Sequence, residues 1–240
     1  MIDTHAHLSS RFSQEVNLEK LKWVILSASC QQDSLDNLEL AKNNPKLLPA
    51  VGIHPGEVGN IDEQINFLDN LCQENKNIVA VGECGFEFVD GVDKKRQEIL
   101  FRGQIAVALK HKKPLIVHSR KASDETLEIL NSYKNLSGVI HCYTGGIKRI
   151  KNVPNSFYFG IDGNITYEVG LEEVVRNIPK DRLVLETDTP FLAPIPHRGE
   201  TNKPEWIEFT YKKVAEIWGM SFDETEKIID KNAERLLNKI

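Results

Sequence analysis

The sequence lacks any long apolar run. No stretch approaches the roughly 20 apolar residues that a membrane-spanning helix requires. The amino-terminal segment carries Asp3 and His5 where a secretion signal would need an apolar core. We therefore expect a cytoplasmic protein that is not associated with a membrane.

Cysteine is scarce, and its spacing argues against a disulfide-rich secreted protein. The four cysteines, Cys30, Cys72, Cys84 and Cys142, are widely spaced and form no C-x-x-C pair. They fall in segments that we expect to face the core. We therefore expect no disulfide framework and interpret the four residues as reduced core thiols.

Positive charge is not in excess either. The chain has 30 Lys and Arg against 35 Asp and Glu, a formal net charge of -5. Because non-specific affinity for nucleic acids comes mainly from Lys and Arg that neutralise phosphates, a broad DNA-coating surface is not expected. A local pocket that grips one strand end is still compatible with this charge, since bound divalent ions would themselves supply positive charge. The charge therefore does not exclude a nuclease.

The sequence does contain a regular alternation of short apolar, β-branched runs with amphipathic stretches, which is typical of βα units around a parallel sheet. Eight such runs occur: MIDTH from Met1, WVILSAS from Trp23, LLPAVGI from Leu47, NIVAVGE from Asn77, PLIVHS from Pro114, GVIHC from Gly138, FYFGID from Phe157 and RLVLETD from Arg182. They predict an α/β fold, a (β/α)8 TIM barrel with extra C-terminal helices, as a single domain over residues 1–240.

Helical patterns lie between these runs. A spacing of three or four residues keeps one apolar face toward the sheet at Ile61, Ile65, Leu68 and Cys72. After the eighth run, Pro204 can start a helix, and Ser221 with Glu224 forms a capping box for the last one. We expect these helices to form the outer ring of the barrel.

Polar residues with metal-binding side chains follow the apolar part of six runs, at the ends where a barrel enzyme carries its active site. These residues are His5, His7, His54, Glu83, His118, His141 and Asp188. A lone histidine at a strand end is more often a hydrogen-bonded structural residue. Four imidazoles and two carboxylates on one rim, however, would bury too many unpaired polar groups unless a metal satisfied them.

Strand alternation predicts how several of these side chains point. His5 and His7 are two residues apart, so an extended strand turns both imidazoles into the barrel mouth as a chelating pair. The same alternation places the pairs His118–Arg120 and His141–Tyr143 on the inner side, and turns Cys84 and Cys142 outward toward the helices. For His111, within the helical run LKHKKP, we expect an exposed helix face instead of a ligand.

The types of predicted ligand restrict the choice of metal ion only in part. Mixed imidazole and carboxylate ligands suit zinc, manganese, iron or nickel, whereas Mg²⁺ prefers oxygen ligands with several waters, so all five ions remain candidates. Glu83 lies near the middle of the rim, and its two oxygens could bridge ions roughly 3.5 to 4 Å apart. Asp188 can bind one ion and orient the attacking water. We therefore expect two divalent ions per chain.

These residues and their surroundings resemble the TatD-like family of metal-dependent deoxyribonucleases along essentially the whole chain. The matching segments are DTHAHL from Asp3, GIHPGE from Gly52, GECGFE from Gly82, PLIVHSR from Pro114, HCYTGG from His141, ETDTPFLAP from Glu186 and RGETNKP from Arg198. Any one of them, such as H-x-H, is weak evidence. Their order at barrel spacing is specific.

The resemblance implies roles for individual residues. His5, His7, Glu83 and Asp188 would hold one ion, and Glu83, His118 and His141 the second. His54 and Arg198 match positions that line the family's substrate cleft, and Arg120 stands where a guanidinium could pair bidentately with a phosphate. The alternative for both arginines is an ordinary salt bridge that braces loops.

Three residues depart from the family pattern. Glu87 stands where the family usually has Asp, Lys121 where an acidic residue often follows, and Asp162 where a small polar residue is common. None of them is a predicted ligand, so they bear on substrate choice and not on metal binding.

The function these features favour is hydrolysis of DNA phosphodiesters by an ion-activated water, with Glu83 and Asp188 as catalytic residues. The resemblance suggests exonucleolytic action on a strand end or single strand as substrate, and no obligate protein partner is evident. One alternative is an amidohydrolase or lactonase, although binuclear members of that class often bridge their ions with a carboxylated Lys from the fourth strand, where this chain has Glu83. A second alternative is a metal-binding barrel without turnover.

Overall fold

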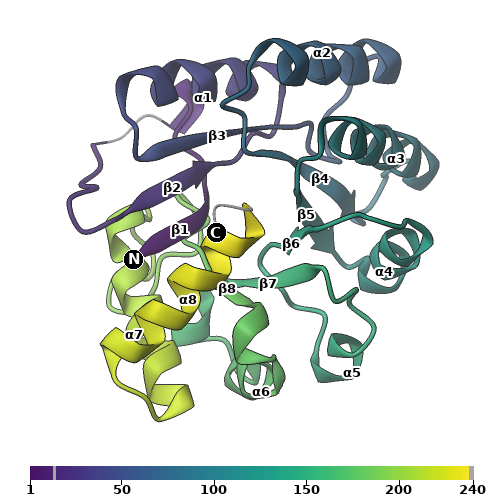
Figure 1. Cartoon of the computed structure of the whole chain (residues 1–240). Helices are drawn as coiled ribbons and strands as arrows, with labels where there is room; N and C mark the ends of the chain where they lie inside the picture. The colour runs from purple at the N-terminus through teal and green to yellow at the C-terminus, as the bar shows by residue number, and fades with distance from the viewer. Residues whose placement is uncertain (13–14, 238–240) are drawn as a thin grey trace.

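All eight predicted runs form parallel strands, which follow one another around the barrel in chain order (Figure 1). The computed structural model describes residues 1–12 and 15–237. The strands are β1 (Ile2–Ala6), β2 (Trp23–Leu26), β3 (Leu47–Val51), β4 (Ala80–Glu87), β5 (Leu115–Arg120), β6 (Gly138–Ile140), β7 (Phe157–Ile161) and β8 (Leu183–Leu185).

The barrel closes between its first and last strands. Just beyond β8, Thr189 forms a parallel bridge with Ala6. The backbone N–H of His7 donates to the carbonyl of Thr189 (2.7 Å), and that of Asp188 donates to the carbonyl of His5 (2.9 Å). The chain therefore folds as the predicted (β/α)8 barrel.

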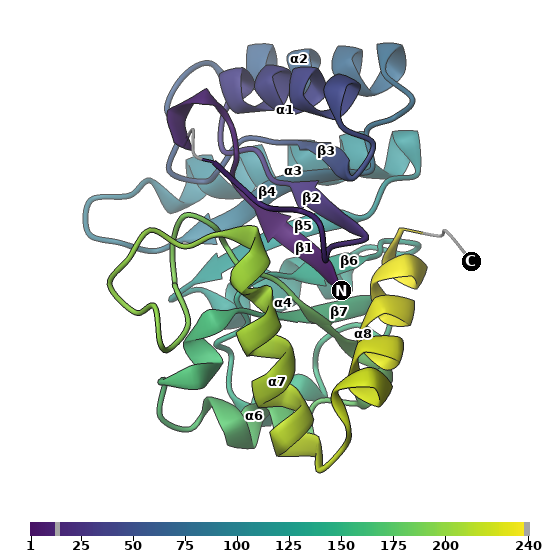
Figure 2. The ribbon, with the colours of Figure 1, turned by 90° about the vertical axis from the view of Figure 1, so that its left-hand side faces the viewer.

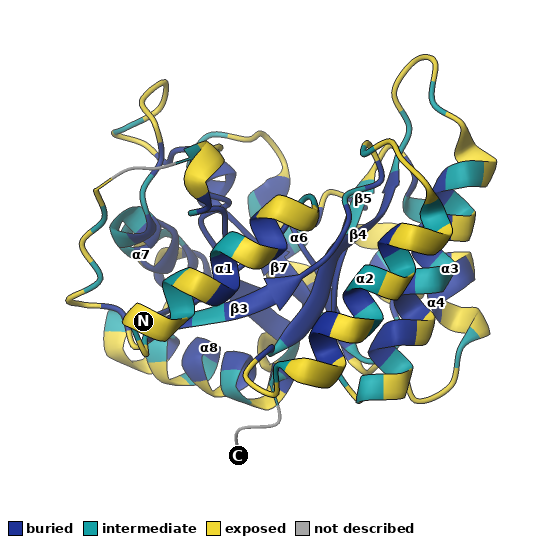
Figure 3. Cartoon of the chain, turned by 90° about the horizontal axis from the view of Figure 1, so that it is seen from above, coloured by how far each residue is buried: buried dark blue, intermediate teal, exposed yellow. Residues whose placement is uncertain are grey.

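Helices surround the strands with their apolar faces inward, and Figure 3 shows a buried sheet inside a ring of helices whose outer faces are exposed. No helix in residues 1–12 and 15–237 is long and apolar enough to cross a bilayer. The helices are α1 (Gln31–Asn43), α2 (Ile61–Glu74), α3 (Lys94–His111), α4 (Ser123–Ser132), α5 (Ile147–Ile150), α6 (Leu171–Asn177), α7 (Ile207–Trp218) and α8 (Phe222–Leu236).

The predicted helix signals act as expected at the carboxyl-terminal helices, which lie beside β1 (Figure 2). Pro204 begins a short 3-10 turn, Pro204–Trp206, that leads directly into α7. Ser221 and Glu224 form the capping box of α8. This box satisfies backbone N–H groups that the first turn of a helix leaves without partners.

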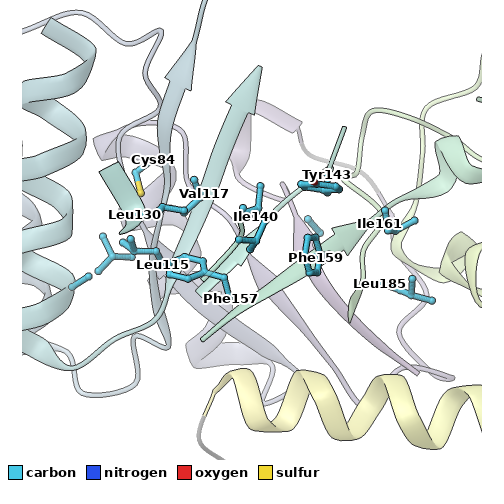
Figure 4. Close-up of a cluster of buried hydrophobic side chains, with 14 of the residues drawn as sticks. Cys84, Leu115, Val117, Leu130, Ile140, Tyr143, Phe157, Phe159, Ile161 and Leu185 are labelled. Atoms are coloured by element: carbon cyan, nitrogen blue, oxygen red, sulfur yellow. The ribbon is translucent and has the colours of Figure 1, made fainter. Parts of the chain in front are cut away.

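The core has two layers, because alternate residues of each strand point to opposite faces. The outer layer lies between the strands and the helices, and Figure 4 shows part of it, including Leu115, Val117, Phe157 and Phe159. The inner layer fills the barrel, and Ala233 and Leu236 of α8 belong to the same cluster as Ile2 of β1 and Trp23 of β2. Helix α8 therefore closes the amino end of the barrel, and the carboxyl end stays free for a site.

Two expectations about single residues are wrong in part. Cys72 and Cys84 are buried thiols as expected, but Cys30 and Cys142 are only partly buried; all four are free. His111 does not lie on an open helix face: its side chain is 12% exposed, and its Nε2 lies 2.8 Å from Asp69 Oδ1. This contact joins the end of α3 to α2, which periodicity within one helix does not reveal.

Candidate metal centre

The carboxyl ends of the strands bring all six predicted ligands together. Five of them are buried: His5, His7, Glu83, His141 and Asp188. His118 is partly buried, with 16% of its side chain exposed. The six come from β1, β4, β5 and the segments that follow β1, β6 and β8, so only the closed barrel makes them neighbours.

A first group of ligand atoms surrounds one point. Its imidazole nitrogens, His5 Nε2 and His7 Nε2, lie 3.1 Å apart. Glu83 Oε2 lies 3.9 and 3.5 Å from them, and Asp188 Oδ1 lies 3.4 and 3.6 Å from them. Four ligands arranged tetrahedrally at zinc-like distances would be roughly 3.3 to 3.6 Å apart. The distances of 3.4, 3.5 and 3.6 Å fall in this range, and those of 3.1 and 3.9 Å lie within a few tenths of an ångström of it, so small shifts would let the first group hold one divalent ion.

A second group faces the other oxygen of the same carboxylate. Glu83 Oε1 lies 2.6 Å from His118 Nδ1 and 2.8 Å from His141 Nε2, and these two nitrogens are 3.1 Å apart. The atoms are at hydrogen-bond distance, so an ion would have to spread them by several tenths of an ångström. Glu83 thus presents one oxygen to each group.

Register shifts in β1 and β4 determine which way the side chains at the site point. The register of β1 shifts between Asp3 and Ala6, and that of β4 shifts between Val81 and Cys84. In each strand the shift exchanges the two faces, as a bulge does, so that Glu83 points into the barrel while Cys84 packs in the outer layer. The outward orientation predicted for Cys84 is confirmed.

Glycines on both sides of Glu83 allow β4 to approach β5 closely. A Cβ atom on Gly82 would lie 2.4 Å from the carbonyl oxygen of Ile116, and one on Gly85 would lie 2.1 Å from that of His118. Both glycines also have positive φ values, 150° and 138°. The motif GECGFE therefore contains glycine where backbone approach and conformation both require it.

The prediction for the end of β6 is wrong beyond His141. Cys142 has a φ of 44°, which breaks the alternation of the strand. Tyr143 consequently points outward and packs edge-on against Phe159, with ring centroids 4.9 Å apart (Figure 4). Cys142 does not turn toward the helices but lines a cavity beside the ligands.

The imidazoles of the first group are held in the state that binds metals. Burial lowers the pKa of His5 well below its ordinary value, and burial also lowers the pKa of His7. Ser27 Oγ lies 3.0 Å from His5 Nδ1, which fixes the ring so that Nε2 faces Glu83 and Asp188. A neutral imidazole whose outer nitrogen is hydrogen-bonded is the form that coordinates an ion.

The second group carries more charge. Burial alone would lower the pKa of His141, but the carboxylates of Glu83 and Glu186 outweigh it and raise this pKa well above the ordinary value. Burial would raise the pKa of Glu83, but the imidazoles of His141 and His118 hold it well below its ordinary value. In the first group, burial, together with the neighbouring carboxylates, raises the pKa of Asp188 well above the ordinary value. A cation would reverse this penalty on Asp188.

Glu186, for which no role was predicted, supports the second group. Its Oε1 accepts a hydrogen bond from the backbone N–H of Cys142 (2.6 Å) and lies 3.6 Å from His141 Nδ1. Gly160 makes room for it, since a Cβ there would lie 2.4 Å from Glu186 Oε2. A carboxylate behind a ligand histidine orients the ring and raises its basicity.

His54 and Arg120 meet at Glu87, one of the residues that depart from the family pattern. Glu87 Oε1 lies 2.8 Å from Arg120 Nη1, and its Oε2 lies 3.8 Å from His54 Nε2. Burial lowers the pKa of His54 to about 4. Its ring centroid is 4.5 Å from that of His118, and ligand atoms of His54, Glu83 and His118 lie within 4.8 Å of one another. The structure therefore places His54 at the edge of the second group.

The other predicted contact residues lie farther out. The guanidinium of Arg198 lies 4.2 Å from the ring centroid of Tyr167, on an exposed loop, and is not among the residues that line the cavity beside the ligands. Lys121 does line this cavity. Asp162 is buried next to the thiol of Cys142, and burial raises its pKa to about 6.

Sequence reasoning assigned no role to several neighbours of the predicted ligands. The cavity holds about 520 Å³ and lies against His118, His141 and Asp188. Phe191 and Leu192 also line it. Glu186 could have been found, because it is a carboxylate only two residues before Asp188 in the matching segment ETDTPFLAP. Phe191 and Leu192 lie in the matching segment ETDTPFLAP, but nothing in that match assigned them a role, and no pattern marks Ser27.

Comparison with known proteins agrees with this architecture. A family described as TatD related DNase matches residues 2–238. An uncharacterized metal-dependent hydrolase, YabD of Bacillus subtilis, is 30% identical over 251 residues, which cover 98% of each chain. An uncharacterized metal-dependent hydrolase of Mycoplasma genitalium is 33% identical over 255 residues, covering 98% of this chain and 97% of the relative.

A solved structure has the same arrangement of elements. The crystal structure of YjjV, a TatD homolog from Escherichia coli, superposes with a TM-score of 0.90 at 26% identity and covers 99% of this chain and 98% of its own. The family match extends over nearly the whole barrel, including every strand that carries a predicted ligand. This chain belongs to the family of TatD-related DNases.

Proposed function

We propose that this protein is a metal-dependent hydrolase that cleaves phosphodiester bonds of DNA, acting exonucleolytically on strand ends. The observation that carries the proposal is the position of Glu83. Its Oε2 faces His5 and His7, and its Oε1 faces His118 and His141, so one carboxylate joins two groups of ligand atoms.

The residues present suit two divalent ions. The first would be held by His5, His7, Glu83 and Asp188, and the second by Glu83, His118 and His141. Divalent ions in a paired site lower the pKa of bound water toward neutrality and stabilise charge on phosphoryl oxygens. The mixed nitrogen and oxygen donors suit zinc, manganese, iron or nickel better than magnesium.

The protein's own side chains would accept the proton of the water and bind the substrate. Asp188 Oδ1 faces the two imidazoles of the first group, which leaves Oδ2 to orient the attacking water and accept its proton. Arg120 lines the cavity with 62% of its side chain exposed, so it can exchange part of its pairing with Glu87 for a phosphate. His54 would contact the substrate beside the second group. Arg198 would act only on a longer strand that reaches the loop of Tyr167.

An amidohydrolase or lactonase is the competing enzyme class, since the same centre could direct water at a carbonyl carbon. The bridge argues against it, because β4 supplies Glu83 and contains no Lys that could be carboxylated. The cationic side chains Arg120 and Lys121 beside the ligands also suit an anionic phosphodiester better than a neutral amide.

The decisive experiment is a substrate panel at saturating Zn²⁺ or Mn²⁺. It includes single-stranded DNA, RNA, a simple aryl phosphodiester, a lactone and an amide. We expect DNA to be shortened from an end and the carbonyl compounds to be turned over far more slowly. Chelation should abolish the activity, and re-addition of the ion should restore it.

Two results would contradict the proposal. Efficient lactone turnover with inert DNA would favour the amidohydrolase class. Two bound ions without turnover of any substrate would favour a metal-binding barrel that has no catalytic role. Asp188→Asn provides the control for contaminating nucleases, because it removes the proton acceptor with little change in side-chain volume.

A further inference from the structure

An exposed aromatic side chain lies directly beside the first ligand group. Phe191 is 49% exposed, and its ring centroid is 6.2 Å from that of His7. Phe12, from the loop after β1, packs edge-on against it at 5.7 Å. Phe191 and Leu192 line the same cavity as His118, His141 and Asp188. Apolar area of this kind costs free energy in water unless a ligand covers it.

The backbone around Phe191 is fixed relative to the ligands. Its N–H donates to the carbonyl of Asp188 (2.8 Å), and its carbonyl accepts from Asn202 Nδ2 (2.7 Å). Asn202 is fully buried and also donates to the carbonyl of Thr187 (2.8 Å). The backbone that carries the exposed ring is therefore held in place relative to Asp188, as a binding surface requires.

The cavity combines this flat apolar face with cations and the ligand cluster. Arg120 and Lys121 line it together with Phe191. Its volume of about 520 Å³ is within the range of sites that bind small molecules. A nucleotide matches all three features, because its base is flat and apolar on its faces while its phosphate is anionic. Proteins that bind single strands combine aromatic platforms with basic side chains in the same way.

We propose that Phe191, braced by Phe12, is the stacking platform for the terminal base next to the scissile phosphate. This inference rests on the proposed function and narrows it to unpaired ends. A base that lies on Phe191 while its phosphate lies at the ligands has left its own stack, which a paired end resists. Single-stranded or frayed ends are therefore the preferred substrates.

The test compares two ends that differ only in the base. Single-stranded oligonucleotides end either in a normal nucleotide or in an abasic residue, placed at the 5′ end in one set and at the 3′ end in another. We expect the protein to prefer the end that carries a base by between about fivefold and about a hundredfold, mainly through KM. A blunt duplex end should be cleaved more slowly than the same end unpaired.

Three variants show whether the preference comes from stacking. Phe191→Leu keeps an apolar side chain over His7 but removes the flat face, so the preference for a base should disappear and the loss should fall on KM. Phe191→Tyr should retain the preference. Phe88→Leu is the matched control, because Phe88 is a partly buried aromatic residue that does not line this cavity. Ion content is measured for each variant, since a merely structural role of Phe191 would change it.

A binding measurement separates this inference from the proposed function. The dissociation constants of both oligonucleotides are measured by fluorescence anisotropy, with a non-bridging sulfur in the terminal linkage to slow cleavage. If no DNA is cleaved but Phe191→Leu abolishes tighter binding of the end that carries a base, the stacking platform stands and the hydrolase proposal fails. If Phe191→Leu keeps the preference of the unaltered protein, the stacking inference is wrong whatever the activity.

Discussion

Glu83 and His54 lie close together at the barrel mouth but contact different atoms. Glu83 presents an oxygen to each ligand group, whereas His54 lies between His118 and Glu87 at the edge of the second group. Substitutions of these two residues can therefore distinguish a side chain that bridges two ions from one that only lies beside the second ion.

We expect Glu83→Gln to damage catalysis more than His54→Ala. A neutral amide of the same shape cannot offer negative charge to two cations, so at least one ion should be lost. His54→Ala should keep at least the ion of the first group and mainly raise KM. Circular dichroism, ion stoichiometry and turnover on one DNA substrate make the comparison. Two ions and full activity in Glu83→Gln would show that Glu83 is not the bridge.

Ion binding should release protons and become tighter as pH rises. In the ion-free protein, His141 and Asp188 have pKa values raised well above their ordinary values, so both hold protons that a cation must displace. Apparent affinity should therefore increase as pH rises through the raised pKa values of these two groups. Calorimetric titration in two buffers with different ionisation enthalpies counts the protons. Equal heats in the two buffers would contradict the expected protonation states.

For single residues, the sequence predicts which side chains converge at the barrel mouth better than it predicts what surrounds them. His5, His7 and Glu83 could be named because strand ends converge in any barrel of this kind. Tyr143 could not be placed, because one residue with positive φ at Cys142 reverses the alternation after it. Glu87 and Arg120 pair across two strands, and a single sequence does not show that register.

Among the elements, β3 and β4 also make a close backbone approach near the site. A Cβ atom on Gly52, one residue after β3, would lie 2.3 Å from the carbonyl carbon of Gly82, the residue before Glu83. Because this atom belongs to the backbone, it cannot avoid a Cβ atom by changing a side-chain rotamer. The position of Glu83 therefore depends on a glycine in a neighbouring strand segment.

Gly52→Ala should push β4 away and weaken ion binding. We expect a loss of roughly 1–3 kcal/mol in the free energy of unfolding, the usual cost of overpacking, together with a lower ion content. Gly103→Ala in α3 is the control, because the nearest atom there is the flexible end of the Ile65 side chain, at 2.7 Å. Denaturant unfolding and elemental analysis test both variants. Unchanged ion binding in Gly52→Ala would show that β4 can move without displacing Glu83.

The elements themselves were predictable where local signals agree. Every strand overlaps an apolar run, and the capping box at Ser221 marks the start of α8. The register shifts in β1 and β4 were not predictable, because they depend on how neighbouring strands pair. Those shifts turn the predicted ligands toward one another. The fold could therefore be predicted more completely than the geometry of the site.

For the whole molecule, the ligand cluster should couple ion binding to stability. Its six side chains come from segments between His5 and Asp188, so a bound ion would link nearly the entire barrel. The purified protein should contain close to two transition-metal ions per chain. Saturating ion should stabilise the fold by about 4 kcal/mol at a thousandfold excess over the dissociation constant. Thermal unfolding with and without chelator measures this, and coincident transitions would argue against a shared centre.

The closure of the barrel through Ala6 and Thr189 also has a consequence during synthesis. At about 5–20 residues per second, Leu183–Leu185 follows β1 from the ribosome only after on the order of 10 to 40 seconds. Throughout that interval one edge of β1 has no partner strand, and such edges invite pairing with other chains. β1 is only five residues long and contains Asp3 and His5, with His7 just beyond it. We therefore expect the polar side chains of this short segment, among them His5 and His7 that are proposed to hold an ion, also to make the nascent edge a poorer template for aggregation.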